Sequence, residues 1–459
     1  MKHASLITLG CKVNSFDTAI LRQALEDKGY TVSDKVVPAD IYIINSCTVT
    51  NSASSQSRQV IRKARKLNPD SMVIVTGCYA QVSPDEVAAI DSVDYVFGNK
   101  EKERIVELIG GAAKGLKLDN EETSYLNKEF DRSAAGLVMV GDISDVKNID
   151  SKPVKNFNKK SRAFLKVQDG CESYCTYCII PAARGRSRSL PIEDVENQAL
   201  EFYANGYNEI VLTGIHLGGY GLDLKEEANL LILLKRLEAM DIDMRFRISS
   251  IEPTEIDDEM IEFLASSGKI CRHLHIPLQS GDEYILSRMG RKYKPSFYMN
   301  LLEKIARKWD GVALGIDIIA GFPGESKGAF LNSYKLIDAS PASYLHVFPY
   351  SVRNGTPAAA MPEHVDPGEI KERCSSLREL GNRKKTGFYS GFLNRTLNVI
   401  AVGERNEFIK LLSDNYIDIY LDKKYTNGGK RFDVTVAQVD KNVCYGVVAD
   451  EKRFLEAGK

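Results

Sequence analysis

About the first hundred residues repeat one pattern, in which a continuous apolar run is followed by a cysteine and then by a polar or amphipathic segment. The runs are SLITLG before Cys11, DIYIINS before Cys47 and SMVIVTG before Cys78. Unbroken β-branched runs of this length indicate strands of a parallel sheet that are buried on both faces. The intervening segments, such as FDTAILRQALEDKG, are typical of helices. The pattern predicts a doubly wound α/β domain over residues 1–112.

Each of these three cysteines comes directly after a predicted strand. Open α/β sheets build their sites at the carboxyl ends of the strands, so the three thiols are expected to meet in space. A single free cysteine is usually a small core residue, and that alternative applies to each one taken alone. A lipid-anchor cysteine at Cys11 is excluded because the preceding apolar run is shorter than the roughly 7–15 residues of a signal segment. Three cysteines in register favour ligands.

A polar, charged stretch over residues 113–158 interrupts the periodicity and is interpreted as a connector that contains one strand candidate, GLVMVGDI. A second α/β series follows over residues 159–387. Six units are fewer than the eight of a closed barrel, so the series predicts an open (βα)6 partial barrel. Its strand candidates are RAFLKVQD, EIVLTG, MRFRISS, RHLHIPLQ, VALGIDIIAG and YLHVFPYS.

The tail over residues 388–455 changes to short alternating runs separated by turn residues. Alternation of apolar and polar positions is typical of strands that are buried on one face. The tail therefore predicts a small all-β barrel or sheet.

Composition adds limits to this picture. The 459 residues include Lys+Arg 61 and Asp+Glu 62, so the net charge of −1 neither requires nor excludes a nucleic-acid partner. No apolar run approaches the roughly 18 residues of a membrane span. Nine cysteines in a long chain with no export signal favour reduced thiols with metal or redox roles over disulfides. We expect a cytoplasmic protein without a membrane partner.

The first strand of the second series leads into DGCESYCTYCIIPAARGRSRS, which contains the spacing C-x3-C-x2-C at Cys171, Cys175 and Cys178. Three thiolates this close repel one another unless a metal neutralises them, and cysteine thiolates are the usual ligands of iron–sulfur clusters. Structural zinc is the alternative, but it prefers four ligands, and the sequence offers no fourth cysteine or histidine nearby. A cluster with three protein ligands leaves one iron open to a small molecule.

This motif, with Tyr177 before its last cysteine, resembles the signature of radical S-adenosylmethionine (SAM) enzymes. Together with LGCKVN, NSCTVT and TGCYAQ around the upstream cysteines, it resembles the radical SAM methylthiotransferase family over nearly the whole chain. Within that family, GCKVN is similar to the branch that modifies N6-threonylcarbamoyladenosine in transfer RNA. The isopentenyladenosine branch and the ribosomal-protein aspartate branch are near relatives.

The resemblance implies two [4Fe-4S] clusters and S-adenosylmethionine as cofactors. The cluster on Cys171, Cys175 and Cys178 would generate a 5′-deoxyadenosyl radical from the cofactor. The cluster on the three upstream cysteines would hold the sulfur that is methylated and inserted at C2 of the adenine. The resemblance also implies a transfer RNA substrate and an electron donor protein of the flavodoxin or ferredoxin type.

Cofactor contacts are expected where the barrel strands end on the cluster side. Thr213 and Gly214 match the position at which the family's backbone meets the methionyl amine, although Thr-Gly-Ile replaces the usual two glycines and acidic residue. A buried polar group without a partner costs about 1–3 kcal/mol, which favours a ligand, but a helix cap or a turn is the alternative for each. The further candidates are Ser249, Ser250, Glu252, Gln279 and Asp317.

Arginines near the cluster motif are candidates for RNA binding, because the guanidinium fork suits phosphate. They are Arg184, Arg186, Arg188 and Arg291. A solvated charged face is the alternative. The terminal β domain resembles the TRAM module, an RNA-binding barrel of this family, but its basic and acidic residues nearly balance, so it lacks the expected basic surface.

The remaining cysteines and the histidines in apolar runs are expected to be structural. These are Cys271, Cys374, Cys444, His216, His273, His275 and His346. Besides methylthiolation of transfer RNA, two other functions stay open at this point. One is the same chemistry on a ribosomal-protein aspartate, and the other is a non-catalytic, metal-stabilised RNA-binding protein.

Overall fold

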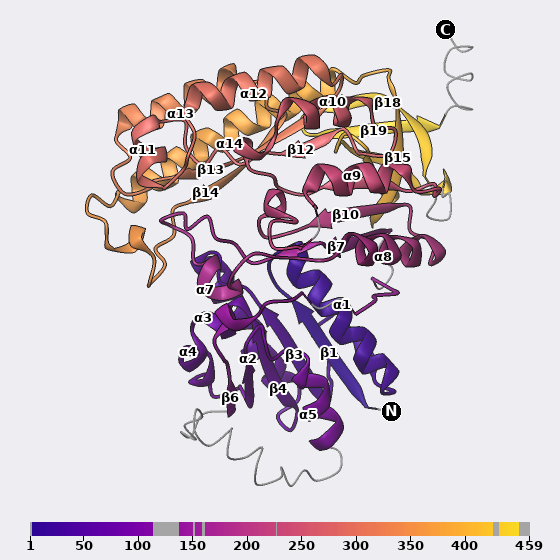
Figure 1. Ribbon diagram of the computed structural model, residues 1–459, viewed down its shortest axis with the longest axis vertical. Helices are drawn as coiled ribbons and strands as arrows, with labels where there is room; N and C mark the ends of the chain where they lie inside the picture. Colours follow the sequence, from indigo (N-terminus) through magenta and orange to yellow (C-terminus); the bar gives the residue numbers. More distant parts are fainter. Residues whose placement is uncertain are drawn as a thin grey trace.

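The computed structural model contains three packed units, an N-terminal sheet, a central barrel and a C-terminal β-barrel (Figure 1). The N-terminal sheet lies below the central barrel in this view, and the C-terminal strands, drawn in yellow, lie at its right. The structure describes residues 2–112, 137–149, 152–157, 161–225, 227–425 and 431–448.

The N-terminal unit is a six-stranded parallel sheet with helices on both faces, as predicted. The connector's strand candidate joins this sheet as its edge strand. In sheet order the strands are β2 (Thr31–Ser33), β1 (His3–Thr8), β3 (Ile41–Ser46), β4 (Met72–Gly77), β5 (Tyr95–Phe97) and β6 (Leu137–Met139). The helices are α1 (Lys12–Asp27), α2 (Asn51–Leu67), α3 (Cys78–Val82), α4 (Pro84–Ala88) and α5 (Arg104–Ala112).

Each face of this sheet has its own apolar core. Leu21 and Leu25 of α1 pack with Ile105 of α5 on one face, while Ile61 of α2 packs with Val87 of α4 on the other. Strands buried on both sides account for the unbroken apolar runs in the sequence.

The central unit is an open barrel of six parallel strands in the order predicted from the sequence. It consists of two three-stranded sheets, which the bridge between Ser250 and His275 connects. The strands are β7 (Arg162–Lys166), β10 (Glu209–Thr213), β11 (Arg245–Ile248), β12 (His273–His275), β13 (Ala313–Ala320) and β14 (Tyr344–Pro349).

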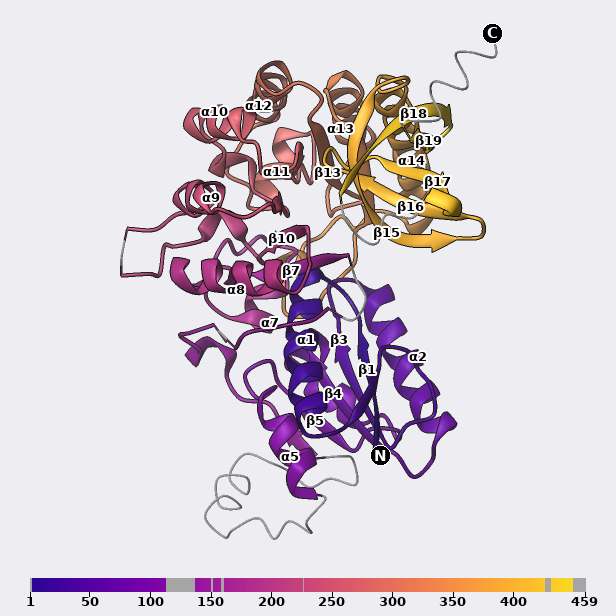
Figure 2. The same ribbon diagram turned by 90° about the vertical axis from the view of Figure 1, so that its right-hand side faces the viewer.

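Helices cover the outside of this barrel (Figures 1 and 2). Their apolar faces and the strands form the largest core of the protein. The helices are α8 (Ile192–Ala204), α9 (Leu230–Ala239), α10 (Asp258–Ser266), α11 (Glu283–Arg288), α12 (Pro295–Lys308), α13 (Lys327–Ala339) and α14 (Pro367–Ser390). Helix α7 (Ile180–Arg184) instead lies against α3 of the N-terminal unit. A short antiparallel pair, β8 (Gln168–Asp169) with β9 (Arg188–Ser189), closes the loop that carries the second cysteine triad.

The C-terminal unit is a closed five-stranded barrel, which confirms the all-β prediction. Alternating inward side chains such as Val399, Leu411 and Ile419 fill its interior. In barrel order the strands are β15 (Thr396–Arg405), β16 (Phe408–Ser413), β17 (Asp418–Asp422), β19 (Val443–Val448) and β18 (Phe432–Asp440).

The C-terminal barrel packs against the amino-terminal ends of the central strands. Arg245 at the start of β11 donates to the carbonyl of Leu412 at 3.1 Å, and Arg247 donates to that of Ser413 at 3.0 Å. The ring of Tyr416 stacks on His273 with 4.2 Å between centroids. Main-chain acceptors of one unit thus satisfy buried donors of the other, which fixes their relative position.

Buried Glu209 holds this arginine group together, and its replacement tests the arrangement. Its carboxylate lies 2.7 Å from Arg245, 2.9 Å from Arg247 and 3.3 Å from Arg162. Removing one partner of a buried charge group leaves the others uncompensated. Glu209→Gln is expected to lower the free energy of unfolding by about 3 kcal/mol in urea titration.

The control is Glu259→Gln, because Glu259 forms an exposed pair with Lys235. This substitution is expected to lower the free energy of unfolding by less than about 1 kcal/mol. Equal effects of the two substitutions would show that the Glu209 group does not stabilise the protein.

Candidate active site between two cysteine triads

The three N-terminal cysteines meet at the carboxyl edge of the sheet. Cys11 caps α1, Cys47 follows β3, and Cys78 is the first residue of α3. A Cβ built on Gly10 would lie 2.8 Å from the sulfur of Cys47, so the first two loops touch. Desolvation of the thiol raises the pKa of Cys11, with Arg184 acting to lower that pKa and Cys78 acting to raise it. The sequence prediction that these thiols converge agrees with this geometry.

Polar side chains that sequence reasoning missed tie the three loops together. Asn14 donates to the carbonyl of Leu9 at 2.8 Å and to that of Ser46 at 3.1 Å. The Ser46 hydroxyl in turn donates to the carbonyl of Thr76, two residues before Cys78. The only sign of these contacts in the sequence is that each of the three loops has a polar residue within three positions of its cysteine.

Gly77 makes the start of α3 possible. Its φ of +94° lies in the left-handed region, and a Cβ there would lie 2.4 Å from the carbonyl oxygen of Ser46. Only glycine therefore lets Cys78 approach the other two loops.

The second triad lies in the loop between β8 and β9. The Thr176 amide donates to the carbonyl of Met289 at 3.0 Å, and its hydroxyl donates to that of Arg288 at 2.8 Å. Arg291 donates to the sulfur of Cys175 at 3.4 Å. The loop is thus fixed from the barrel side, with a cation already beside one sulfur.

The donor set of each triad fits a cluster better than a single metal ion. Each triad supplies three thiols, whereas a closed structural zinc site takes four ligands. Cysteine thiolates are the usual ligands of iron–sulfur clusters.

Burial also shapes the chemistry of the thiols. It raises the pKa of Cys47 to about 11 and that of Cys178 to about 12, and the neighbouring cysteines add to the effect. Without metal these thiols therefore keep their protons at neutral pH. Cluster assembly must displace them, which couples metal binding to proton release.

A cavity of about 200 Å³ lies where the segment after Cys47 meets the loop of the second triad. Val49 and Thr50, just after Cys47, form one wall, while Tyr177 and Cys178 belong to the other. Helices α3 and α7, which adjoin Cys78 and Cys178, pack against each other (Figure 1). The two triads therefore lie on neighbouring loops, and of their six cysteines Cys178 lines the cavity.

The candidate cofactor residues differ in their surroundings. The hydroxyl of Ser249 is buried and has no hydrogen-bond partner among the described residues, so it is available to a ligand. The backbone of Thr213 and Gly214 lies beside Gln168, which accepts a hydrogen bond from His216 at 2.8 Å. Ser250 is exposed.

Glu252 and Gln279 complete the set. Glu252 is paired with Arg291, and burial, partly offset by that arginine, raises its pKa. Gln279 lines the cavity and has a φ of 63°, unusual for a residue other than glycine.

Asp317 lies at the centre of a histidine group. His275 approaches its carboxylate at 2.8 Å and His346 at 3.3 Å, and these three ligand atoms all lie within 4.8 Å of one another. Burial acts to raise the pKa of Asp317, but the two imidazoles outweigh it and hold that pKa well below its usual range. His346 is exposed over half its side chain, which corrects the expectation of a core histidine.

His216 is a second correction, because it belongs to the site. It contacts the sulfur of Cys171 and the carboxylate of Glu255. Hydrogen bonds to these two groups raise the pKa of His216 to about 10. Burial acts to raise the pKa of Cys171, but hydrogen bonds from His216 and Ser173 outweigh it and lower that pKa.

Most of the arginines that the sequence suggested as RNA-binding residues are buried. The side chains of Arg184, Arg188 and Arg291 are only 2%, 5% and 6% exposed. A phosphate cannot reach these guanidinium groups at the surface, which argues against the expected phosphate contacts. Arg186 is exposed and stays a candidate.

Known families match both halves of this site. Residues 3–98 match the family described as "Uncharacterized protein family UPF0004", and residues 165–337 match the Radical SAM superfamily. The chain is 42% identical to the threonylcarbamoyladenosine tRNA methylthiotransferase MtaB of Bacillus subtilis, over 90% of this chain and 88% of the relative. The chain belongs to the radical SAM methylthiotransferase family. It is an enzyme that uses S-adenosylmethionine and [4Fe-4S] clusters.

Other relatives cover a similar part of this methylthiotransferase. MtaB of Rickettsia prowazekii is 38% identical over 91% of each chain. The tRNA-2-methylthio-N(6)-dimethylallyladenosine synthase of Fusobacterium nucleatum is 33% identical, over 90% of this chain and 91% of the relative.

Among solved structures, the radical S-adenosylmethionine methyltransferase TsrM of Kitasatospora setae has the same fold. The TM-score is 0.58 at 16% identity, over 78% of this chain and 77% of that chain. In the described part of the methylthiotransferase, no helix is both long and apolar enough to span a bilayer.

Iron and sulfide analysis after anaerobic reconstitution tests whether both triads hold clusters. Replacing the three N-terminal cysteines by alanine is expected to halve the iron and sulfide content of the full chain, and replacing the other triad should do the same. Cys374→Ala, a buried change on α14, is the control and should leave both contents unchanged. Full iron content in either triad variant would rule out the two-cluster site.

Proposed function

We propose that this enzyme inserts a methylthio group at C2 of N6-threonylcarbamoyladenosine next to the anticodon of transfer RNA. The observation that carries the proposal is the packing of α3 against α7, which brings two cysteine triads together, each with three thiols. Two centres that each keep an open coordination site suit a reaction that needs both a radical and a sulfur atom.

The residue roles follow from position. Cys171, Cys175 and Cys178 would hold the cluster that binds S-adenosylmethionine, and the N-terminal triad would hold the second cluster. When bound, the cofactor and clusters supply a 5′-deoxyadenosyl radical, a methyl group and a sulfur atom. The chain itself encloses the reacting atoms in a small cavity and limits competing reactions of the radical.

Ser249 and Gln279 are the protein groups best placed to bind the cofactor. The Ser249 hydroxyl lacks a partner among the described residues, and Gln279 lines the cavity beside Cys178. Thr213, Gly214, Ser250, Glu252 and Asp317 remain proposed contacts.

The relatives favour the threonylcarbamoyladenosine substrate. The Bacillus subtilis and Rickettsia prowazekii proteins, named for that nucleoside, are 42% and 38% identical to this chain, whereas the dimethylallyladenosine enzyme is 33% identical. LGCKVN around Cys11 supports the same branch. Isopentenyladenosine in tRNA and a ribosomal-protein aspartate are the alternative substrates.

The RNA and protein partners are proposals of the same kind. Arg186 is exposed beside the second triad and would contact a phosphate. The C-terminal barrel, which resembles the TRAM module, is a second candidate RNA surface. We propose a flavodoxin or ferredoxin as electron donor.

Nucleoside mass spectrometry tests the substrate. Deleting the gene is expected to remove 2-methylthio-N6-threonylcarbamoyladenosine from bulk transfer RNA and to leave its unthiolated precursor. Reintroducing the wild-type gene should restore the product, and the Cys175→Ala gene should not. Loss of the methylthio form of isopentenyladenosine, or of a modified aspartate, with this nucleoside unchanged would refute the choice of substrate.

The division of roles between the triads has its own test. Cys175→Ala is expected to abolish 5′-deoxyadenosine formation, because the cofactor's cluster is lost. Cys47→Ala is expected to keep 5′-deoxyadenosine formation and to abolish sulfur insertion. Chromatography of one reaction mixture measures both 5′-deoxyadenosine and the methylthiolated nucleoside. Loss of both activities in Cys47→Ala, with iron still bound at the second triad, would mean that the roles are wrongly divided.

A further inference from the structure

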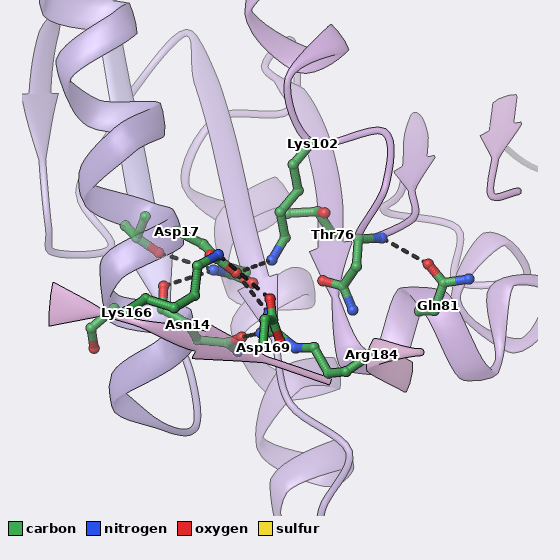
Figure 3. Close-up of polar contacts among 12 residues, drawn as sticks. Asn14, Asp17, Thr76, Gln81, Lys102, Lys166, Asp169 and Arg184 are labelled. Atoms are coloured by element: carbon green, nitrogen blue, oxygen red, sulfur yellow. Dashed lines mark hydrogen bonds and ion pairs between the residues drawn. The ribbon is translucent and has the colours of Figure 1, made fainter. Parts of the chain in front are cut away.

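A buried ion network joins the two cluster-bearing units (Figure 3). Asp17, on α1 six residues after Cys11, accepts from Lys102 at 2.6 Å and from Lys166 at 2.5 Å. Arg184, at the end of α7, donates to the same carboxylate at 3.0 Å. One carboxylate of the N-terminal unit therefore binds cations from both units.

Asp169 is the second anion of the network and lies two residues before Cys171. Arg184 approaches it at 3.1 Å, Lys166 at 3.5 Å and Arg188 at 3.8 Å. Arg184 also donates to the side-chain oxygen of Asn14 (Figure 3). Asn14 is the residue that connects the loops of the first triad. Arg184 thus contacts the polar frame of both triads.

The charges of this network do not balance. Four cationic side chains, Lys102, Lys166, Arg184 and Arg188, face two carboxylates, which leaves an excess of two positive charges. Each of these side chains is at most 10% exposed. Buried charge without a counter-charge is costly, so an anion is expected nearby.

Besides the two aspartates, cysteines of the first triad face Arg184, and their sulfurs are anionic when they bind metal. Cys11 and Cys78 both act electrostatically on Arg184, and Cys78 acts on Lys102. The Nε–H of Arg184 is buried and has no hydrogen-bond partner among the described residues. A buried donor without a partner costs about 1–3 kcal/mol, which an adjacent anionic sulfur would remove.

We propose that Arg184 is a positioning residue for the N-terminal cluster, whose negative charge it balances and to whose sulfur it donates its Nε–H. The inference rests on the proposed two-cluster function and adds a role for a residue first expected at RNA. Net charge and hydrogen bonds to sulfur set the reduction potential of such clusters. A nearby cation favours the reduced, more negative form.

The test is a redox titration of the N-terminal cluster alone, followed by electron paramagnetic resonance. The parent is the full chain with Cys171, Cys175 and Cys178 replaced by alanine. Arg184→Met in this parent is expected to keep the cluster and to shift its reduction equilibrium at least tenfold toward the oxidised form, about 59 mV for one electron. Arg186→Met, an exposed arginine two residues away, is the matched control and should shift it less than threefold.

Two further variants cover the case in which Arg184→Met does not keep its cluster. Arg184→Lys retains the positive charge, so its reduction equilibrium is expected to lie between that of the parent and that of Arg184→Met. Asp17→Asn removes an anion beside Arg184 and should shift the equilibrium at least threefold toward the reduced form. These two variants then decide the proposal.

The outcomes separate this proposal from the function itself. An Arg184→Met or Asp17→Asn protein that keeps its cluster, with a reduction equilibrium shifted no more than in the Arg186→Met control, overturns the role of Arg184 alone. A parent without any cluster overturns both that role and the two-cluster function.

Discussion

The arrangement of the site depends on a buried carboxylate shared between two sheets. Asp17 belongs to the N-terminal unit, yet two of its partners, Lys166 and Arg184, come from the barrel. Without it, three buried cations would face one another across the boundary between the units. The carboxylate therefore orients the carboxyl edges of both sheets toward one space.

The two cysteine triads lie on two different kinds of loop. The first triad collects one cysteine from each of three successive strand ends, so its geometry depends on the register of the whole sheet. The second triad lies within one short loop, which the pairing of β8 with β9 closes. A sheet-built site and a loop-built site thus lie beside each other where α3 packs on α7, and the first is the more sensitive to changes far from it in sequence.

Sequence reasoning succeeded where the signal was periodic. Unbroken apolar runs placed the buried strands, and cysteines at equal positions after three of them indicated a common edge. It failed where a role depends on contacts distant in the chain. Arg184 belongs to a run of arginines that suggested a surface, but its partner Asp17 lies 167 residues away. His216 lies beside an apolar strand, and nothing local in the sequence indicates its contact with Cys171.

The stacking of Tyr416 on His273 has a consequence for access to the barrel. This contact belongs to the surface that covers the amino-terminal ends of the barrel strands, opposite the cysteine loops. The cavity of about 200 Å³ beside Cys178 is the opening that remains next to the cysteine loops. For the proposed transfer RNA substrate, the adenine would leave its stack to reach this cavity, at a cost of a few kcal/mol that is smallest for an unpaired nucleotide. A hairpin loop is the element of that proposed substrate that needs the least distortion.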